Sequence, residues 1–113
     1  QEALRYILEA KNEVPESSEM YMDLGKIYMA QNDLNSTLES YDKAIQINPD
    51  DYRPYYESAL IQRGRKDYVN AENMMRKAAQ LRPSDVSIKR QLGAIVALNL
   101  VQNAQESTNG SKF

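Results

Sequence analysis

Residues 17–49 decide the fold, and they read SSEMYMDLGKIYMAQNDLNSTLESYDKAIQINP. Ser17 is a favourable N-cap residue, and apolar or aromatic side chains then recur at the spacing of a helix. Asn32 tolerates the left-handed backbone that ends a helix, and Asp33 can cap the helix that follows. The second helix must stop before Pro49, because proline lacks the amide hydrogen that a helix interior needs. This stretch therefore predicts a helix, a tight turn and a second helix.

The same plan recurs along the chain with a period of 34 residues. Three sets of residues are each spaced by 34 positions. They are the prolines Pro15, Pro49 and Pro83, the alanines Ala10, Ala44 and Ala78, and the short capping residues Ser17, Asp51 and Asp85. Because unrelated residue types share the period, it indicates one small structural unit that is stacked repeatedly. We therefore expect an α-solenoid, in which each unit buries its apolar face only against its neighbours.

The period divides the chain into a solenoid at 1–102 and a tail. We expect the second helix of a partial repeat at 1–17, complete repeats at 18–51 and 52–85, a first or capping helix at 86–102, and a polar, disordered tail at 103–113. The chain thus begins in the middle of a repeat, and we expect it to be a piece of a longer protein.

The composition removes several classes of chemistry. The chain has 113 residues, enough for one domain with a modest core, and it has no Cys, His or Trp. This excludes disulfides, cysteine nucleophiles, thiolate or imidazole metal sites and histidine acid–base catalysis. We expect no catalytic residues, no metal and no cofactor. No apolar run approaches the ~18 residues of a membrane-spanning helix.

The net charge of −2 is spread unevenly. Residues 1–51 carry 4 basic and 11 acidic side chains, a net charge of −7, whereas residues 52–113 carry 10 basic and 5 acidic ones, a net charge of +5. Such an array can orient a partner or favour head-to-tail contact. The alternative interpretation is that these charges only keep mixed helix faces in water.

The positions that keep the period also form a pattern of residue types. One unit carries Tyr21-x-x-Leu24-Gly25-x-x-Tyr28, Thr37-x-x-x-Tyr41, Ala44 and Pro49; the next carries Ala71-x-x-x-Met75, Ala78 and Pro83; the last helix keeps Leu92-Gly93. In this register the chain resembles the tetratricopeptide repeat family. The resemblance implies an all-α fold, a right-handed α-solenoid of antiparallel helix pairs with about six helices. Gly25, Ala59 and Gly93 are expected where neighbouring helices approach closely, because small residues suit such places.

In this family the first helices of the repeats line the concave face of the superhelix, where partner segments usually bind. The resemblance predicts a partner-binding groove on first-helix side chains that do not fill packing places: Met22, Lys26, Met29, Arg53, Tyr56, Leu60, Arg63, Arg90 and Ala94. The apolar members supply contact area, and the cations suit acidic groups of a partner. The alternative is that these side chains form one exposed, solvated face.

One branch of the family clamps the C-terminal carboxylate of chaperones with Lys, Asn and Arg at fixed groove places. Here those places hold Met22, Lys26, Glu57, Ser87 and Gln91, and no pair of Asn residues is present among them. We therefore expect that this segment does not capture chaperone tails.

These observations favour a non-catalytic scaffold or assembly factor that binds a peptide or helix of a partner protein in the groove. The alternative is a structural solenoid that self-associates through its ends or stacks within a larger protein or complex. Nucleic-acid binding is not expected, because the first half is acidic and the pI is near 5.2. The apolar last helix, from Ile88 to Val101, either packs on the preceding unit or meets a partner, a second copy or further chain.

Overall fold

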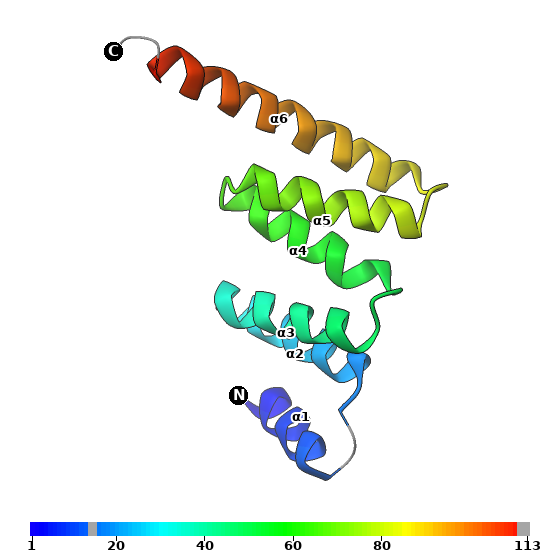
Figure 1. The fold of residues 1–113 in the computed structure, drawn as a ribbon. Helices are drawn as coiled ribbons and strands as arrows, with labels where there is room; N and C mark the ends of the chain where they lie inside the picture. The colour runs from blue at the N-terminus through cyan, green and yellow to red at the C-terminus, as the bar shows by residue number, and fades with distance from the viewer. Residues whose placement is uncertain (14–15, 111–113) are drawn as a thin grey trace.

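A computed structural model describes residues 1–13 and 16–110 of the chain. This part consists of six α-helices without a strand: α1 (Glu2–Glu13), α2 (Ser18–Ala30), α3 (Leu34–Ile47), α4 (Tyr52–Gly64), α5 (Tyr68–Leu81) and α6 (Val86–Gly110). The helices are stacked in chain order in a body of 58 × 33 × 19 Å (Figure 1). The predicted all-α solenoid is therefore confirmed.

The helices are joined as two antiparallel hairpins, α2 with α3 and α4 with α5 (Figure 1). Each hairpin turns at one residue with left-handed backbone, Asn32 at φ 60° and Lys66 at φ 65°. The next residue in each turn, Asp33 or Asp67, donates its backbone N–H to a carbonyl of the preceding helix at 2.9 Å. These bonds satisfy carbonyl groups that have no partner inside the helix, so the turn ends one helix while the Asp caps the next.

The helix starts follow the N-caps expected from the sequence. Five side chains each accept a hydrogen bond of 3.0–3.3 Å from a backbone N–H two or three residues ahead: Ser17, Asp33, Asp51, Asp67 and Asp85. Each bond satisfies an amide that has no partner inside its helix. Helices α3 and α5 end two residues before Pro49 and Pro83, as predicted, and Pro15 lies outside the described residues.

The apolar side chains form two buried clusters that cross the boundaries between units. The first cluster joins α2, α3 and α4: Tyr21, Met22, Leu24, Tyr41, Ala44 and Ile61. The second joins α4, α5 and α6: Tyr55, Ala59, Ala71, Met75, Ala78, Ile88 and Ile95. Because Ile61 of α4 packs into the first cluster while Tyr55 and Ala59 pack into the second, burial depends on stacking one unit on the next.

Two of the three small residues lie at close approaches between helices, as expected. Gly25 abuts the ring of Tyr41, and Ala59 is completely buried. Gly93 is exposed, with no neighbouring atom within 4 Å of the place where a Cβ would stand. The expectation for Gly93 is therefore wrong in this structure, because no second helix packs against α6 at that place.

Helix α6 also continues further than the sequence pattern predicts. It runs to Gly110, so the expected end near 102 and the disordered tail are wrong for residues 103–110. The expectation for 111–113 lies outside the described residues. Near its C-terminal half, α6 is tied to the preceding hairpin by Asn99 Nδ2, which donates to Glu72 Oε1 at 3.2 Å, and by Gln102 Nε2, which donates to the Lys66 carbonyl at 3.4 Å.

The extension of α6 has a local cause in the turn positions. Leu100 stands 34 residues after Lys66, where a left-handed residue closes the earlier hairpins, and bulky side chains disfavour that backbone. Val101 stands where Asp33 and Asp67 cap the second helices, and it has no side-chain oxygen. Without a turn or a cap, and with no Pro in the segment, the helix simply continues.

Candidate functional site

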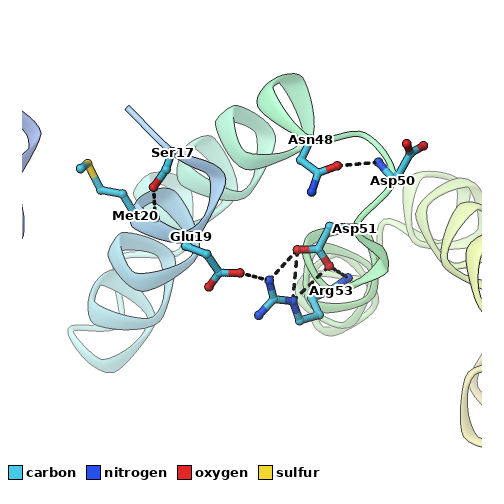
Figure 2. Close-up of polar contacts among 7 residues, drawn as sticks. All are labelled: Ser17, Glu19, Met20, Asn48, Asp50, Asp51 and Arg53. Atoms are coloured by element: carbon cyan, nitrogen blue, oxygen red, sulfur yellow. Dashed lines mark hydrogen bonds and ion pairs between the residues drawn. The ribbon is translucent and has the colours of Figure 1, made fainter. Parts of the chain in front are cut away.

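Helices α2, α4 and α6, the first helices of their units, share one face of the stack, which we call the first-helix face. Side chains bridge these helices twice. Arg53 of α4 pairs with Glu19 of α2 (Figure 2), and Arg63 Nη1 of α4 donates to Gln91 Oε1 of α6 at 2.6 Å. Three helices that are separated along the chain by α3 and α5 are therefore linked through polar side chains.

Local structure explains why Glu19 meets Arg53. The two residues are 34 positions apart, so each occupies the first turn of its helix in the same register. The Ser17 hydroxyl accepts from the Met20 N–H at 3.1 Å and fixes the start of α2 (Figure 2). Asp51 does the same for α4 through the Arg53 N–H at 3.0 Å. The two caps thus place an acidic and a basic side chain opposite each other.

Arg53 is held by two carboxylates. Its Nε donates to Asp51 Oδ1 and Oδ2 at 3.0 and 3.1 Å, and its Nη2 donates to Asp51 Oδ2 at 2.7 Å in addition to pairing with Glu19 (Figure 2). The hydrogen bonds from Arg53 hold the pKa of the Asp51 carboxyl below its usual value, and those to Asp51 and Glu19 raise the pKa of Arg53. The charge of Arg53 is therefore already matched, and this side chain links α2 to α4.

A hollow of about 250 Å³ lies between the first turns of α4 and α6. Its walls are Tyr52, Arg53, Tyr56, Glu57, Asp85, Ser87 and Ile88. It contains two members of the predicted groove, Arg53 and Tyr56. The sequence analysis gave Tyr52 no role, and it interpreted Asp85 only as a capping residue, so neither was included in the predicted groove. The sequence signal that could have identified Tyr52 is its aromatic side chain at the start of a first helix. In the structure, the Arg82 guanidinium stacks over the Tyr52 ring, 4.5 Å from its centroid.

The structure distributes the nine predicted groove residues over three levels of burial. Lys26, Met29, Arg90 and Ala94 are exposed; Arg53, Tyr56, Leu60 and Arg63 are half-buried; Met22 is buried. Tyr56 and Leu60 also pack against the second core cluster. The exposed members therefore offer direct contact area, whereas the half-buried ones also contribute to packing or bridge helices.

Met22 is a core residue in this structure. It is 1% exposed and belongs to the first buried cluster, together with Ile61 of α4. Its assignment to an exposed groove surface is therefore corrected. The physical reason is packing between helices: Met22 lies in the cluster to which α2, α3 and α4 contribute side chains, so neighbouring helices cover the face of α2 that carries it. The helical spacing within α2 alone does not reveal that this face is covered.

The unpaired charges of the first-helix face are mixed in sign, and all but the half-buried Glu57 are exposed. Among the described residues, Lys26 and Arg90 have no hydrogen bond or ion pair, and the same holds for the carboxylates of Asp23 and Glu57. Glu57 also contributes, after burial, to the raised pKa of the Tyr41 hydroxyl. The unpaired charges thus lie at intervals along the face and do not form a patch of one sign.

Two other features, a metal-binding cluster and a membrane-spanning helix, are absent from the part of the chain that the structure describes. Within 1–13 and 16–110, no group of three or more acidic side chains is arranged to hold a metal ion. Over the same ranges, none of the helices combines the length and the apolar character that crossing a membrane requires.

Comparisons with known proteins agree with the fold and the repeat pattern. The family model described as TPR repeat matches residues 25–63. Protein O-mannosyl-transferase TMTC1 of Homo sapiens is 32% identical over 78 residues, which are 69% of this chain and 9% of that protein. The Hsp70-Hsp90 organising protein of Plasmodium falciparum is 25% identical over 105 residues, which are 93% of this chain and 42% of that protein.

The crystal structure of MamA protein superimposes on this chain with a TM-score of 0.80. The match covers 91% of this chain and 56% of that one at 16% identity, so it is a likeness of fold alone. The chain spans less than half of the length of both curated relatives.

Proposed function

Because the chain carries tetratricopeptide repeats, which in general mediate protein–protein interaction, we propose that it is a non-catalytic scaffold that binds a peptide or helix of a partner protein across its first-helix face. The observation that carries this proposal is the pair of links Glu19–Arg53 and Arg63–Gln91. They link three first helices through side chains, which supports the proposal that one partner segment contacts all three.

The exposed side chains of this face suit an amphipathic partner segment. Met29 is 38% exposed, and its flexible thioether can adapt to different apolar side chains. Lys26 on α2 and Arg90 on α6 are unpaired among the described residues and can each hold an acidic group. We propose a partner segment with apolar residues between two acidic ones, lying across α2, α4 and α6.

The half-buried arginines have a different part in this proposal. Arg53 pairs with Glu19 of α2, and Arg63 donates to Gln91 of α6, so both side chains bridge neighbouring first helices. Tyr52 and Tyr56 line the hollow between α4 and α6, which can accept one side chain of the partner. Capture of chaperone tails is not part of the proposal, because two of the places where a carboxylate clamp uses Lys, Asn or Arg hold Met22, which is buried, and Glu57, which is acidic.

The test is a capture experiment on exposed residues, so that folding is preserved. The chain is immobilised as the unaltered protein and as the variant Lys26→Glu/Met29→Glu/Arg90→Glu, and bound proteins are quantified by mass spectrometry from an extract of the cells that make it. A partner bound through the first-helix face is expected to be lost from the variant. Circular dichroism and thermal melting show that the variant is folded.

The matched control carries the same kinds of change on the second helices: Lys43→Glu/Val69→Glu/Lys77→Glu. These three side chains are exposed on α3 and α5, and the control has the same net charge as the first variant. It is expected to retain the partner. Equal recovery by all three proteins would contradict the proposal and would place binding elsewhere on the chain.

A further inference from the structure

The two boundaries between first helices differ at one place of the repeat. Where α2 meets α4, Arg53 stands two residues after the cap Asp51, and its guanidinium lies between Asp51 and Glu19 (Figure 2). Where α4 meets α6, the residue in the same register is Ser87, two residues after the cap Asp85. Because serine is too short to fill the place that an arginine occupies one repeat earlier, this boundary keeps a hollow of about 250 Å³.

Two carboxylates of this hollow lack a counter-charge. Asp85 uses Oδ1 for capping, where it accepts from the Ile88 N–H at 3.2 Å, and its Oδ2 has no hydrogen bond or ion pair to any described residue. Glu57 of α4 is half-buried and likewise unpaired within the described ranges. Arg53 also lines the hollow, but two other carboxylates already match its charge. The hollow therefore presents two acceptors that are free for a cation.

The remaining large walls of the hollow are the aromatic side chains of Tyr52 and Tyr56. Aromatic faces attract cations, and a planar guanidinium stacks on them. Tyr52 already makes such a contact, because Arg82 stacks over its ring, 4.5 Å from the centroid. The two cations in the first turns of α6, Lys89 and Arg90, are not among the residues that line the hollow. The walls thus combine the two features that suit a guanidinium group, aromatic rings and unpaired carboxylates.

We propose that this hollow binds the guanidinium group of an arginine of the partner segment, as the chain itself holds Arg53 one repeat earlier. Asp51 accepts three hydrogen bonds of 2.7–3.1 Å from that guanidinium, and Asp85 Oδ2 and Glu57 offer the corresponding acceptors in the hollow. The volume is smaller than the roughly 300–1,000 Å³ of pockets for whole small ligands, so it suits one side chain. The inference deepens the proposed function and rests on it for the source of the arginine.

The test titrates the full chain with Nα-acetyl-arginine amide and follows the backbone amides by ¹⁵N NMR. This probe has the guanidinium group and no carboxylate. Saturable shifts are expected at Tyr52, Glu57, Ser87 and Ile88. Nα-acetyl-citrulline amide has the same shape without the charge, and Nα-acetyl-lysine amide has the charge without the planar fork. Both are expected to bind at least about tenfold more weakly. No saturable shift with the arginine probe, or equally tight binding of either other probe, would overturn the proposal.

Two charge-removing variants locate the site. Asp85→Asn keeps an N-cap residue, and Glu57→Gln keeps the size of its side chain. Each is expected to weaken the arginine probe at least about tenfold. The matched control is Asp23→Asn, which removes an unpaired charge at the place on α2 that is equivalent to Glu57. It is expected to bind the probe normally. An equal loss in the control would mean that the general charge of the first-helix face attracts the probe, which would overturn the proposed site.

Ser87→Arg gives the second boundary the arginine that the first one has. It is expected to abolish probe binding, because its own guanidinium fills the hollow, and to raise the urea midpoint of unfolding. Unchanged probe binding by this variant would contradict the proposal. Lys26→Glu/Met29→Glu changes only α2 and is expected to bind the probe normally. A failed capture experiment with intact probe binding would therefore remove the proposed scaffold function and leave the arginine site standing, whereas loss of probe binding alone would remove the site.

Discussion

Gly25 of α2 lies directly against the ring of Tyr41 of α3. A Cβ atom at Gly25 would overlap with Tyr41 Cε1, closer than real side-chain contacts allow. The ring is 2% exposed and is surrounded by the first core cluster, so it has little room to move away. The equivalent place in α6, at Gly93, faces open space.

This difference predicts opposite effects for the same substitution at two glycines. Gly25→Ala is expected to lower the free energy of unfolding by about 1–3 kcal/mol, because the buried ring must shift. Gly93→Ala is expected to raise it by about 0.5–1 kcal/mol, because alanine favours the helix and meets no neighbour. Urea denaturation at low protein concentration checks both values. A neutral or stabilising Gly25→Ala would show that α2 and α3 are not in such close contact.

Met22 and Met29 lie on the same helix, and the structure assigns them different roles. Met22→Ala is expected to cost about 2–5 kcal/mol, because it leaves a cavity among buried side chains. Met29→Ala is expected to change stability by no more than about 0.5 kcal/mol, because Met29 is exposed. Chemical denaturation of both variants checks the contrast. Similar small effects for the two substitutions would contradict the burial of Met22 in the first core cluster.

The repeated part of the fold was predictable because its signals are local. Capping by Ser17 and the aspartates, the left-handed Asn32 and the stop before Pro49 each act within a few residues of the chain. Their 34-residue period then indicates the stack without any knowledge of contacts. Lys66 is the one turn residue that the sequence did not predict, because lysine has no particular preference for the left-handed backbone that it adopts there.

The parts that the sequence pattern did not predict depend on contacts between units or on the absence of a neighbour. Met22 is buried in a cluster that α3 and α4 help to form, and Arg53 of α4 pairs with Glu19 of α2, so the roles of both side chains depend on other helices. The open place at Gly93 follows from a turn that does not form. Of the predicted groove, the surface position of Lys26, Met29, Arg90 and Ala94 followed from helical spacing, whereas binding by these residues stays a prediction.

The Asp51–Arg53 contact predicts a loss of stability in acid. The pKa of Asp51 lies below its usual value of about 3.9 in the folded chain, because Arg53 donates hydrogen bonds to the carboxylate. The folded state is therefore stabilised above that value, and this contribution is lost as the pH falls from about 4 through the lowered pKa. Asp51→Asn keeps an N-cap residue but has no such titration. Its stability is expected to fall less than that of the unaltered chain between pH 5 and pH 2, measured by urea midpoints.

The control for this measurement is Glu39→Gln, which removes a charge from an exposed residue far along the chain from Arg53. Its acid profile is expected to run parallel to that of the unaltered chain. Asp33 and Glu72 also have lowered pKa values, so Asp51→Asn is expected to reduce the acid effect and not to remove it. Identical profiles for Asp51→Asn and the unaltered chain would show that Arg53 does not favour the charged form of Asp51.

The missing turn in α6 predicts the effect of restoring it. Leu100→Asn/Val101→Asp recreates the Asn-Asp pair that closes the first hairpin. The segment after it is polar, with Gln102, Gln105 and Glu106 at the places of Leu34, Thr37 and Leu38, so it cannot pack back on α6 as a second helix. Residues 102–108 are therefore expected to lose their helical structure, which Cα chemical shifts in NMR spectra measure directly. Leu100→Ala/Val101→Ala is the control, and it is expected to keep the helix because alanine favours it. Unbroken helical shifts through residue 108 in the Asn-Asp variant would mean that contacts such as Gln102 with the Lys66 carbonyl, and not the lost turn residues, hold the end of α6 in place.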